Sequence, residues 1–275
     1  MSFFQDKVIV ITGGSEGIGK ALIETLIPLG AKVATCARNH DKLYQLQMTY
    51  ARSGIHTVAC DVSKEQDCKR FIESTIKTFG GIDILINNAG ISMRALVKDV
   101  DVEVMRKVMD INFFGAVYCT KFALPSITER KGTIVGISSI AGYRGLPGRS
   151  AYSASKFALQ GFLEALRIEL LDDNVNVMWV SPNFVTSNIR NAALDSQGHA
   201  QKENPMDESK LMSAEECARR ILDAAERRRR SIVMTTQGKL TVWLNKLFPS
   251  LADSLVYKHF LKEPGSPLRK YESNR

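Results

Sequence analysis

The sequence predicts an α/β fold in which seven parallel strands form one doubly wound sheet flanked by helices. Three observations lead to this prediction. Short apolar runs alternate with amphipathic helical stretches almost to the end of the chain. The runs are apolar throughout, which indicates strands buried on both faces. Regular alternation of strand and helix indicates a parallel sheet with right-handed crossovers.

The expected elements follow one another in a simple order. Short runs rich in β-branched residues predict strands at 8–11, 32–36, 57–59, 84–86, 133–137, 175–180 and 232–234. Apolar residues spaced three and four apart predict helices at 17–29, 41–51, 64–79, 102–127, 152–171 and 214–227. These elements make a single domain of residues 1–236, expected to bind a dinucleotide and carry the catalytic groups.

Residues 186–212 interrupt the alternation, because they are polar and lack a strong period. They follow the sixth strand on its carboxyl side, where ligands enter such sheets. We therefore expect a substrate lid, and a plain surface loop is the alternative.

Residues 237–275 form an expected C-terminal helical extension. An apolar stripe is interrupted at Pro249 and then resumes; its members are Leu240, Trp243, Leu244, Leu247, Leu251, Leu255 and Phe260. Stripes flanked by lysines usually pack on their own protein or on a twin subunit. Contact of 240–260 with a membrane surface is the alternative.

Composition narrows the function classes. With 275 residues, 44% of them hydrophobic, the chain can bury a sizeable core. The formal net charge of +8 favours anionic partners such as phosphorylated cofactors, acidic lipids or nucleic acid. The chain has no zinc-finger, RRM or basic-zipper signature, so a nucleic-acid partner is not expected.

The remaining composition points to a cytoplasmic protein without a metal. Five scattered cysteines without a CxxC pair indicate reduced thiols, and four histidines lack metal-ligand spacing. The N-terminal apolar run is short and passes into a glycine motif, unlike a signal peptide. No stretch approaches the roughly 20 apolar residues of a membrane span.

A glycine turn follows the first expected strand and opens the first helix. Its GxxxGxG spacing lets backbone N–H groups approach a pyrophosphate at a helix N-terminus. The residues expected to contact the cofactor there are Gly13, Ser15, Glu16, Gly17, Ile18 and Gly19.

The second strand indicates which dinucleotide binds. NAD-binding sheets usually end this strand in Asp or Glu, which holds the ribose 2′-hydroxyl. Here Arg38 stands at that end, and its guanidinium suits a 2′-phosphate. We therefore expect NADP(H) rather than NAD(H), although the charge of Glu16 opposes a nearby phosphate.

Tyr152 and Lys156 lie four residues apart, so they share one face of a helix. They begin an otherwise apolar, inward-facing stripe. A buried lysine beside a phenol favours the phenolate and lowers the pKa of the tyrosine, which suits proton transfer. The alternative is a lysine whose amine extends into solvent.

With these motifs, the chain resembles the short-chain dehydrogenase/reductase family over roughly residues 6–236. The motifs that carry the resemblance are the turn at 12–19, Asp61-Val62, Asn87-Asn88-Ala89-Gly90, Asn112, Ser139 and Tyr152-xxx-Lys156. The resemblance implies a Rossmann-type fold and a homodimer or homotetramer packed through the helices that contain Asn112 and Tyr152.

The resemblance also assigns cofactor contacts. Asp61 would hydrogen-bond the adenine, and Val62 would cover its ring. Asn88, Ala89 and Gly90 would line the ribose side, and Asn88 would also connect the central strands. The segment that would touch the nicotinamide carboxamide contains Pro182, Asn183, Val185 and Thr186. The family commonly has glycine where Asn183 stands, and asparagine tolerates the left-handed conformation better than most residues.

Catalytic roles follow from the same resemblance. Lys156 would bind the nicotinamide ribose and lower the pKa of Tyr152, the proton donor. Ser139, selected over Ser138 by its interval of thirteen residues to Tyr152, would hold the substrate oxygen. Asn112 would support a water relay behind Lys156.

The expected function is NADP(H)-dependent interconversion of a carbonyl and a secondary alcohol. The lid and extension resemble those of members acting on lipophilic or acyl substrates, such as 3-oxoacyl, steroid-like or retinoid-like molecules. Two alternatives remain. One is a catalytically silent, NADP-binding regulatory or scaffold protein, and the other is an NADP-linked epimerase or dehydratase.

Overall fold

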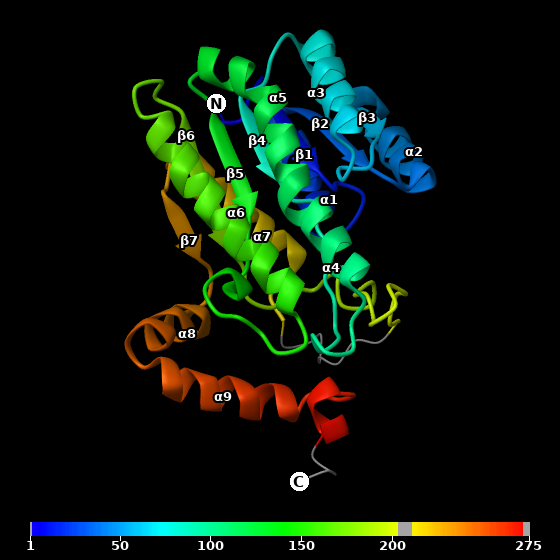
Figure 1. Ribbon diagram of the computed structural model, residues 1–275. Helices are drawn as coiled ribbons and strands as arrows, with labels where there is room; N and C mark the ends of the chain where they lie inside the picture. The colour runs from blue at the N-terminus through cyan, green and yellow to red at the C-terminus, as the bar shows by residue number, and fades with distance from the viewer. Residues whose placement is uncertain (1, 203–210, 272–275) are drawn as a thin grey trace.

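A parallel sheet forms the centre of the computed structural model, which describes residues 2–202 and 211–271 (Figure 1). The strands are β1 (Val8–Thr12), β2 (Lys32–Ala37), β3 (His56–Ala59), β4 (Ile84–Asn87), β5 (Thr133–Ile137), β6 (Asn176–Ser181) and β7 (Ser231–Val233). Their order is β3-β2-β1-β4-β5-β6-β7, and every neighbouring pair is parallel. The expected seven-stranded, doubly wound fold is confirmed.

Helices cover both faces of the sheet. They are α1 (Gly17–Leu26), α2 (His40–Thr49), α3 (Glu65–Phe79), α4 (Val102–Met109), α5 (Gly115–Glu129), α6 (Ser150–Glu169) and α7 (Ala214–Glu226). Two further helices, α8 (Thr236–Leu247) and α9 (Pro249–Leu261), follow β7. On one face α1 packs against α7; on the other α3 contacts α5 and α4 contacts α6.

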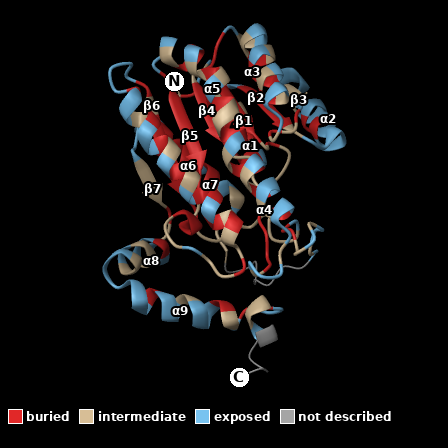
Figure 2. Ribbon diagram, viewed as in Figure 1, coloured by how far each residue is buried: buried red, intermediate tan, exposed pale blue. Residues whose placement is uncertain are grey.

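The alternation of side chains along each strand divides the core into two apolar layers. In β1, Ile9 and Ile11 belong to the layer beneath α1 and α7, whereas Val10 belongs to the layer beneath α3 and α5. Figure 2 shows that most of the sheet is buried, with exposure on the outer faces of the helices. Burial on both sides explains why the strands are apolar throughout.

The helix expected at 102–127 is divided in the structure. α4 ends at Met109, a π-helical segment spans Asp110–Phe114, and α5 begins at Gly115. A π turn inserts one extra residue into the helical spiral, which changes the direction of the following side chains. Asn112 lies in this segment and is 1% exposed.

The last two helices, α8 and α9, lie across the carboxyl ends of the strands, and we call residues 236–261 the C-terminal arm (Figure 1). Pro249 begins α9, at a position where its missing N–H is not needed. Phe260 is buried, whereas Trp243, Leu247 and Leu251 are exposed. Within the described residues, we find no helix that combines the length and apolar character required to cross a membrane.

The five cysteines all lie in described elements or loops. Each is buried, and none forms a disulfide. Their thiols therefore belong to the core of the domain.

Candidate functional site

A cleft of about 870 Å³ lies at the carboxyl edge of the sheet, between the strand ends, the lid segment and the C-terminal arm. Most residues that the sequence assigned to a site line this cleft: Gly13, Ser15, Glu16, Gly17, Ile18, Arg38, Asp61, Val62, Asn88, Ala89, Gly90, Ser139, Tyr152, Lys156, Pro182, Asn183 and Val185. Gly19, Asn112 and Thr186 do not line it. The carboxyl ends of β1 and β4 lie side by side at this edge. From this point the strands follow one another in opposite directions across the sheet, β1 to β3 on one side and β4 to β7 on the other.

The glycine turn lets the backbone approach closely at one end of the cleft. Gly13 and Gly17 have φ angles of 72° and 53°, in the left-handed region that favours glycine. A side chain at Gly13 would place its Cβ 3.0 Å from the Cα of Ala89. The first turn of α1 has no side-chain cap at Glu16, so its N–H groups suit a pyrophosphate.

Gly19 has a packing role instead of lining the cleft. A Cβ at this position would lie 2.7 Å from Nδ2 of Asn88 and would collide with the carbonyl oxygen of Gly13. Asn88 itself donates from Nδ2 to the carbonyl oxygens of Thr12, at 2.9 Å, and Gly13, at 3.1 Å. These two bonds fix the glycine turn to the segment that follows β4.

Arg38 is exposed at the mouth of the cleft. Nearby, the Glu16 carboxylate forms an ion pair with Lys42 of α2. Asn39 caps the same helix by accepting a hydrogen bond from the Lys42 backbone at 3.0 Å. The negative charge that opposed a 2′-phosphate is therefore paired with a cation.

Asp61 and Val62 follow β3 and line the same cleft. Oδ1 of Asp61 accepts hydrogen bonds from the backbone of Ser63 at 3.1 Å and from its hydroxyl at 2.8 Å. These contacts fix the orientation of the carboxylate. Val62 is buried and packs against the position of Gly115.

Tyr152 and Lys156 both belong to the first turns of α6. The Nζ atom of Lys156 donates to the carbonyl oxygen of Ile137 at 2.8 Å, and it lies 5.6 Å from the ring centroid of Tyr152. Burial lowers the pKa of Lys156 to about 8. The two side chains are therefore adjacent, in a place where charge is costly.

Several influences act on the pKa of Tyr152. Removal of the phenol from water raises the pKa, whereas a hydrogen bond with Ser139 and the charge of Arg149 lower it. The net direction is upward. An effect of Lys156 on this pKa remains a prediction.

The two candidate serines have different surroundings. The hydroxyl oxygen of Ser138 accepts a hydrogen bond from Nε2 of Gln160 at 2.8 Å, and its residue is 3% exposed. Ser139 lines the cleft, and its oxygen accepts from the backbone of Ala141 at 3.2 Å. Ser139 is the serine whose hydroxyl lowers the pKa of Tyr152.

Asn112, in the π-helical segment, connects the loop after β4 with helix α6. Its Oδ1 accepts from the backbone N–H of Ile91 at 2.8 Å, and its Nδ2 donates to the Ile91 carbonyl and to the hydroxyl of Ser155, both at 2.9 Å. A Cβ at Gly90 would lie 3.2 Å from Oδ1 of Asn112 and 3.6 Å from Nζ of Lys156. Asn112 thus lies close to Lys156, on the side away from the cleft.

Two residues that follow β6, Asn183 and Thr186, make contacts with other parts of the chain. Asn183 does not have a positive φ, so its tolerance of the left-handed conformation is not required. Its Nδ2 donates to Oε1 of Gln237 at 3.5 Å. The backbone N–H of Thr186 donates to the carbonyl oxygen of Met212 at 2.9 Å, which joins the two ends of the lid segment.

The described part of the lid segment contributes to the wall of the cleft. Ile189 and Ala192 line the cleft, and Ala193 and Leu194 are buried. Leu194 forms a bridge with Met93. Residues 203–210 of the expected lid lie outside the described part of the chain.

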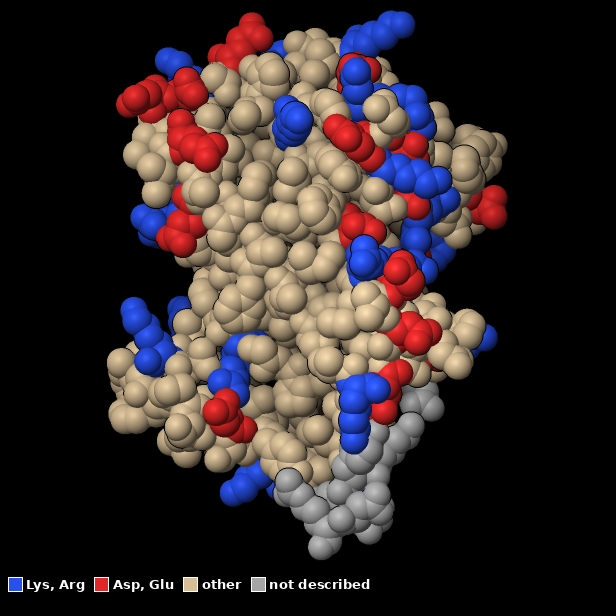
Figure 3. Space-filling view, viewed as in Figure 1, with Lys and Arg blue, Asp and Glu red and all other residues tan. Residues whose placement is uncertain are grey.

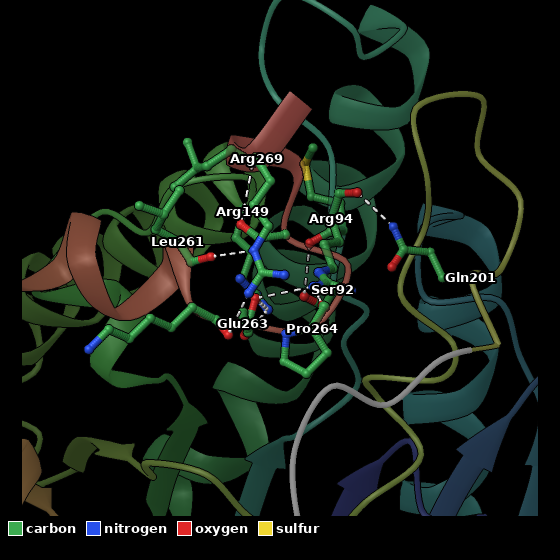
Figure 4. Close-up of polar contacts among 12 residues, drawn as sticks. Ser92, Arg94, Arg149, Gln201, Leu261, Glu263, Pro264 and Arg269 are labelled. Carbon is green, nitrogen blue, oxygen red and sulfur yellow. Dashed lines mark hydrogen bonds and ion pairs between the residues drawn. The ribbon is translucent and has the colours of Figure 1, made fainter. Parts of the chain in front are cut away.

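One cluster of charges was missed by the sequence analysis (Figure 4). The carboxylate of Glu263, just beyond α9, forms ion pairs with Arg149 at 2.9 Å and Arg94 at 3.5 Å. Arg149 occupies the N-cap position of α6, three residues before Tyr152. Its nearness to Tyr152 in the sequence was the available signal for Arg149; Arg94 and Glu263 gave none.

Within the described ranges, 2–202 and 211–271, no group of three or more His, Cys, Asp or Glu side chains is arranged to hold a metal ion. The residues of the cleft instead match a dinucleotide: a tight glycine turn at a helix start, a basic residue at one end and a tyrosine–lysine pair at the other.

Comparisons with known proteins place the chain among oxidoreductases. The family model described as short chain dehydrogenase matches residues 7–198. The chain is 35% identical to mouse dehydrogenase/reductase SDR family member 7B, over 95% of this chain and 84% of the relative. It is 32% identical to 11-beta-hydroxysteroid dehydrogenase A of Sesamum indicum, over 95% of this chain and 77% of the relative.

Two solved structures have the same fold. A short chain dehydrogenase/reductase from Burkholderia phymatum, in complex with NAD, gives a TM-score of 0.80 at 24% identity, covering 91% of this chain and 96% of that one. An alcohol dehydrogenase from Thermococcus sibiricus, complexed with 5-hydroxy-NADP, gives 0.73 at 22% identity, covering 83% and 95%. The pair includes both kinds of dinucleotide, so the likeness does not distinguish between them.

Proposed function

The chain belongs to the short-chain dehydrogenase/reductase family, an oxidoreductase family, and we propose that it interconverts a carbonyl and a secondary alcohol on a lipophilic substrate with NADP(H). One observation carries the proposal: Ser139, Tyr152 and Lys156 converge in the same cleft as the glycine turn. Such an arrangement pairs a dinucleotide with a proton donor.

The dinucleotide supplies hydride chemistry when it is bound. The residues of the chain bind, orient and transfer the proton. In carbonyl reduction, negative charge grows on the substrate oxygen, and the hydroxyl of Tyr152 donates its proton there. The hydroxyl of Ser139 donates a hydrogen bond to the same oxygen and stabilises the developing charge.

Lys156 has two roles in this proposal. Its buried Nζ, held by the carbonyl oxygen of Ile137, would donate to the nicotinamide ribose. Its charge would also favour the phenolate of Tyr152. Asn112, which connects Ile91 and Ser155, would fix the position of the lysine and support a water relay behind it.

The walls of the cleft support a lipophilic substrate. Apolar side chains come from the loop after β5, from the lid and from the C-terminal arm: Ile140, Leu146, Ile189, Leu240, Leu244, Val256 and Phe260. A carbonyl compound with a large apolar body would bury that surface at roughly 25 cal/mol per Å².

The catalytic proposal is tested by NADPH oxidation with a panel of aliphatic, steroid and 3-oxoacyl carbonyl compounds. Tyr152→Phe should lose turnover by at least about a hundredfold, because general acid catalysis contributes 10²–10⁴-fold. Tyr44→Phe, which changes an exposed tyrosine of α2, is the matched control. Undiminished turnover in Tyr152→Phe would reject the mechanism. NADPH binding without turnover on any carbonyl would favour the silent scaffold protein.

The NADP(H) preference rests on Arg38 and on the pairing of Glu16 with Lys42. In a binding titration, Arg38→Ala should weaken NADPH by about tenfold or more, because it removes a hydrogen bond between charged groups. NADH binding should be unchanged. Arg52→Ala, an exposed arginine of the same region, should alter neither. Equal affinity of the wild-type protein for both dinucleotides would contradict the preference.

A further inference from the structure

Glu263 is a buried carboxylate two residues beyond the end of the C-terminal arm. Its residue is 7% exposed, and both of its oxygens accept from Nη2 of Arg149, at 2.9 and 3.1 Å. Nη2 of Arg94 lies 3.5 Å from Oε2 on the other side. Figure 4 shows the two arginines converging on this carboxylate. A buried carboxylate persists only where partners compensate its lost hydration.

Arg94 holds the chain around Glu263 as well as its charge. The guanidinium also donates to the carbonyl oxygen of Pro264. The backbone of Arg94 is fixed in turn, because its N–H donates to Leu194 at 2.8 Å and its carbonyl accepts from Nε2 of Gln201 at 2.6 Å. The carboxylate is therefore positioned by a rigid part of the domain.

Arg149 lies in the same cleft as Tyr152, the proposed proton donor. It occupies the N-cap position of α6, three residues before Tyr152, and both residues line the cleft. Its positive charge lowers the pKa of Tyr152. The guanidinium lies 4.8 Å from the ring centroid of Phe260, which also belongs to the C-terminal arm. Phe260 and Glu263 therefore both contact Arg149, which lies in the same cleft as the proposed proton donor.

We propose that Glu263 is a positioning residue, which holds Arg149 beside Tyr152 so that docking of the C-terminal arm sets the electrostatic environment of the proton donor. The inference deepens the proposed function and rests on it for the role of Tyr152. The cation at position 149 favours the phenolate, which the reaction forms whenever the proton leaves. If the C-terminal arm did not pack against the domain, Glu263 would not hold Arg149. The fold and the cofactor site would persist, but the pKa of Tyr152 would be higher.

Other charges face the same cleft and must be separated from this effect. The charged or titratable side chains that line it besides Arg149 and Tyr152 are Glu16, Arg38, Asp61, Arg144, Lys156, Arg190 and His259. Arg144 is paired with Asp253, and Lys156 titrates near pH 8. A pH profile of turnover would mix these groups, whereas the ultraviolet absorbance of the phenolate reports tyrosine alone.

The experiment is therefore an ultraviolet difference titration of phenol ionisation, with each protein measured against its own Tyr152→Phe counterpart. Circular dichroism at each pH verifies that the fold persists. Arg149→Met should raise the midpoint of Tyr152 by about one pH unit, the size of a nearby unit charge. Glu263→Ala should raise it in the same direction. In the Arg149→Met background, Glu263→Ala should add no further shift, because it acts through the arginine.

Three outcomes would overturn the proposal. An unchanged midpoint in Glu263→Ala would show that Arg149 stays in place without the carboxylate. A lower midpoint would show that Glu263 only screens the arginine. A full shift in the Arg149→Met background would show that Glu263 acts by another route.

Two further variants keep the test decisive. If Glu263→Ala unfolds, Arg94→Met/Glu263→Met replaces the buried ion pair by apolar side chains, a change that proteins often tolerate. It should raise the midpoint as well. Asp253→Ala removes the ion pair between α9 and Arg144 but leaves the pair of Glu263 with Arg149 in place, so it should leave the midpoint unchanged. Because the titration needs no turnover, it can fail or succeed independently of any carbonyl substrate.

Discussion

Lys156 shows the conflict between stability and function at a single residue. The side chain is 5% exposed, and burial lowers its pKa from 10.5 to about 8. Below pH 8 the folded protein must therefore hold a charge that water would solvate better. A neutral side chain at this position would avoid that cost but would lose the proposed ribose contact.

This conflict predicts a pH-dependent gain in Lys156→Met. A depressed lysine pKa means that the unfolded chain binds more protons between pH 8 and 10.5, so the destabilisation is full below pH 8 and disappears above 10.5. The shift corresponds to about 3 kcal/mol, from which we subtract about 1 kcal/mol for the lost hydrogen bond to Ile137. Lys156→Met should thus raise the free energy of unfolding by about 2 kcal/mol at pH 6.

Urea unfolding at pH 6, 9 and 10 measures this gain, which should shrink as the pH rises. Lys20→Met, which changes an exposed lysine of α1, should show no such trend. A pH-independent difference between wild type and Lys156→Met would contradict the assigned pKa.

At the residue scale, the sequence pointed to the candidate catalytic groups but not to their surroundings. Tyr152 and Lys156 were visible because they interrupt an apolar stripe. Glu263 was not visible, because a single acid in a polar tail has no periodic signal and its partners are 114 and 169 positions away. Contacts of that kind follow from the folded chain alone.

At the scale of elements, the C-terminal arm has apolar side chains both on the side that lines the cleft and on the side that faces solvent. Leu244 lines the cleft, whereas Leu247, nearly one turn later in α8, is 51% exposed. The inner face of the arm therefore belongs to the candidate site and the outer face does not.

Two matched substitutions test the division. Leu244→Asn should lower kcat/KM for a long-chain ketone by about tenfold, because about 1–2 kcal/mol of apolar contact is lost, and should spare a short-chain ketone. Leu247→Asn should change neither value. The measurement is steady-state kinetics with a series of ketones of increasing chain length. Equal losses on long and short ketones would show that α8 does not contact the substrate.

The strands could be predicted to within one or two residues, because burial on both faces leaves a continuous apolar run. The helices α1, α3, α6 and α7 followed from their spacing for a similar reason. The π-helical segment at Asp110–Phe114 could not be predicted, since one inserted residue leaves the apolar spacing almost unchanged. That segment buries Asn112, so the missed detail belongs to the site.

At the scale of the whole molecule, the outer face over α5 and α6 carries few charges, as Figure 3 shows. Phe114 and Phe157 are 40% and 47% exposed there. An apolar face with aromatic side chains suits a subunit interface. We therefore expect the subunits of a homo-oligomer to meet through this face.

A charge placed on this face should prevent assembly. We expect Phe114→Glu/Phe157→Glu to be monomeric by light scattering, because burying two carboxylates without partners costs several kcal/mol. Met48→Glu, at an exposed apolar residue of α2, should keep the mass of the wild-type protein. If wild type and double variant have the same mass, the subunits do not meet through this face.

The ion pairs of Glu263 also have a consequence for the timing of folding during synthesis. Arg149 leaves the ribosome 114 residues before its partner, an interval of roughly 6 to 23 s at 5–20 residues per second. The sheet up to β7 can form during that time. The nascent domain therefore holds its tyrosine and lysine before residue 263 emerges, and it acquires the full charge pattern around the proposed proton donor only after that residue has left the ribosome.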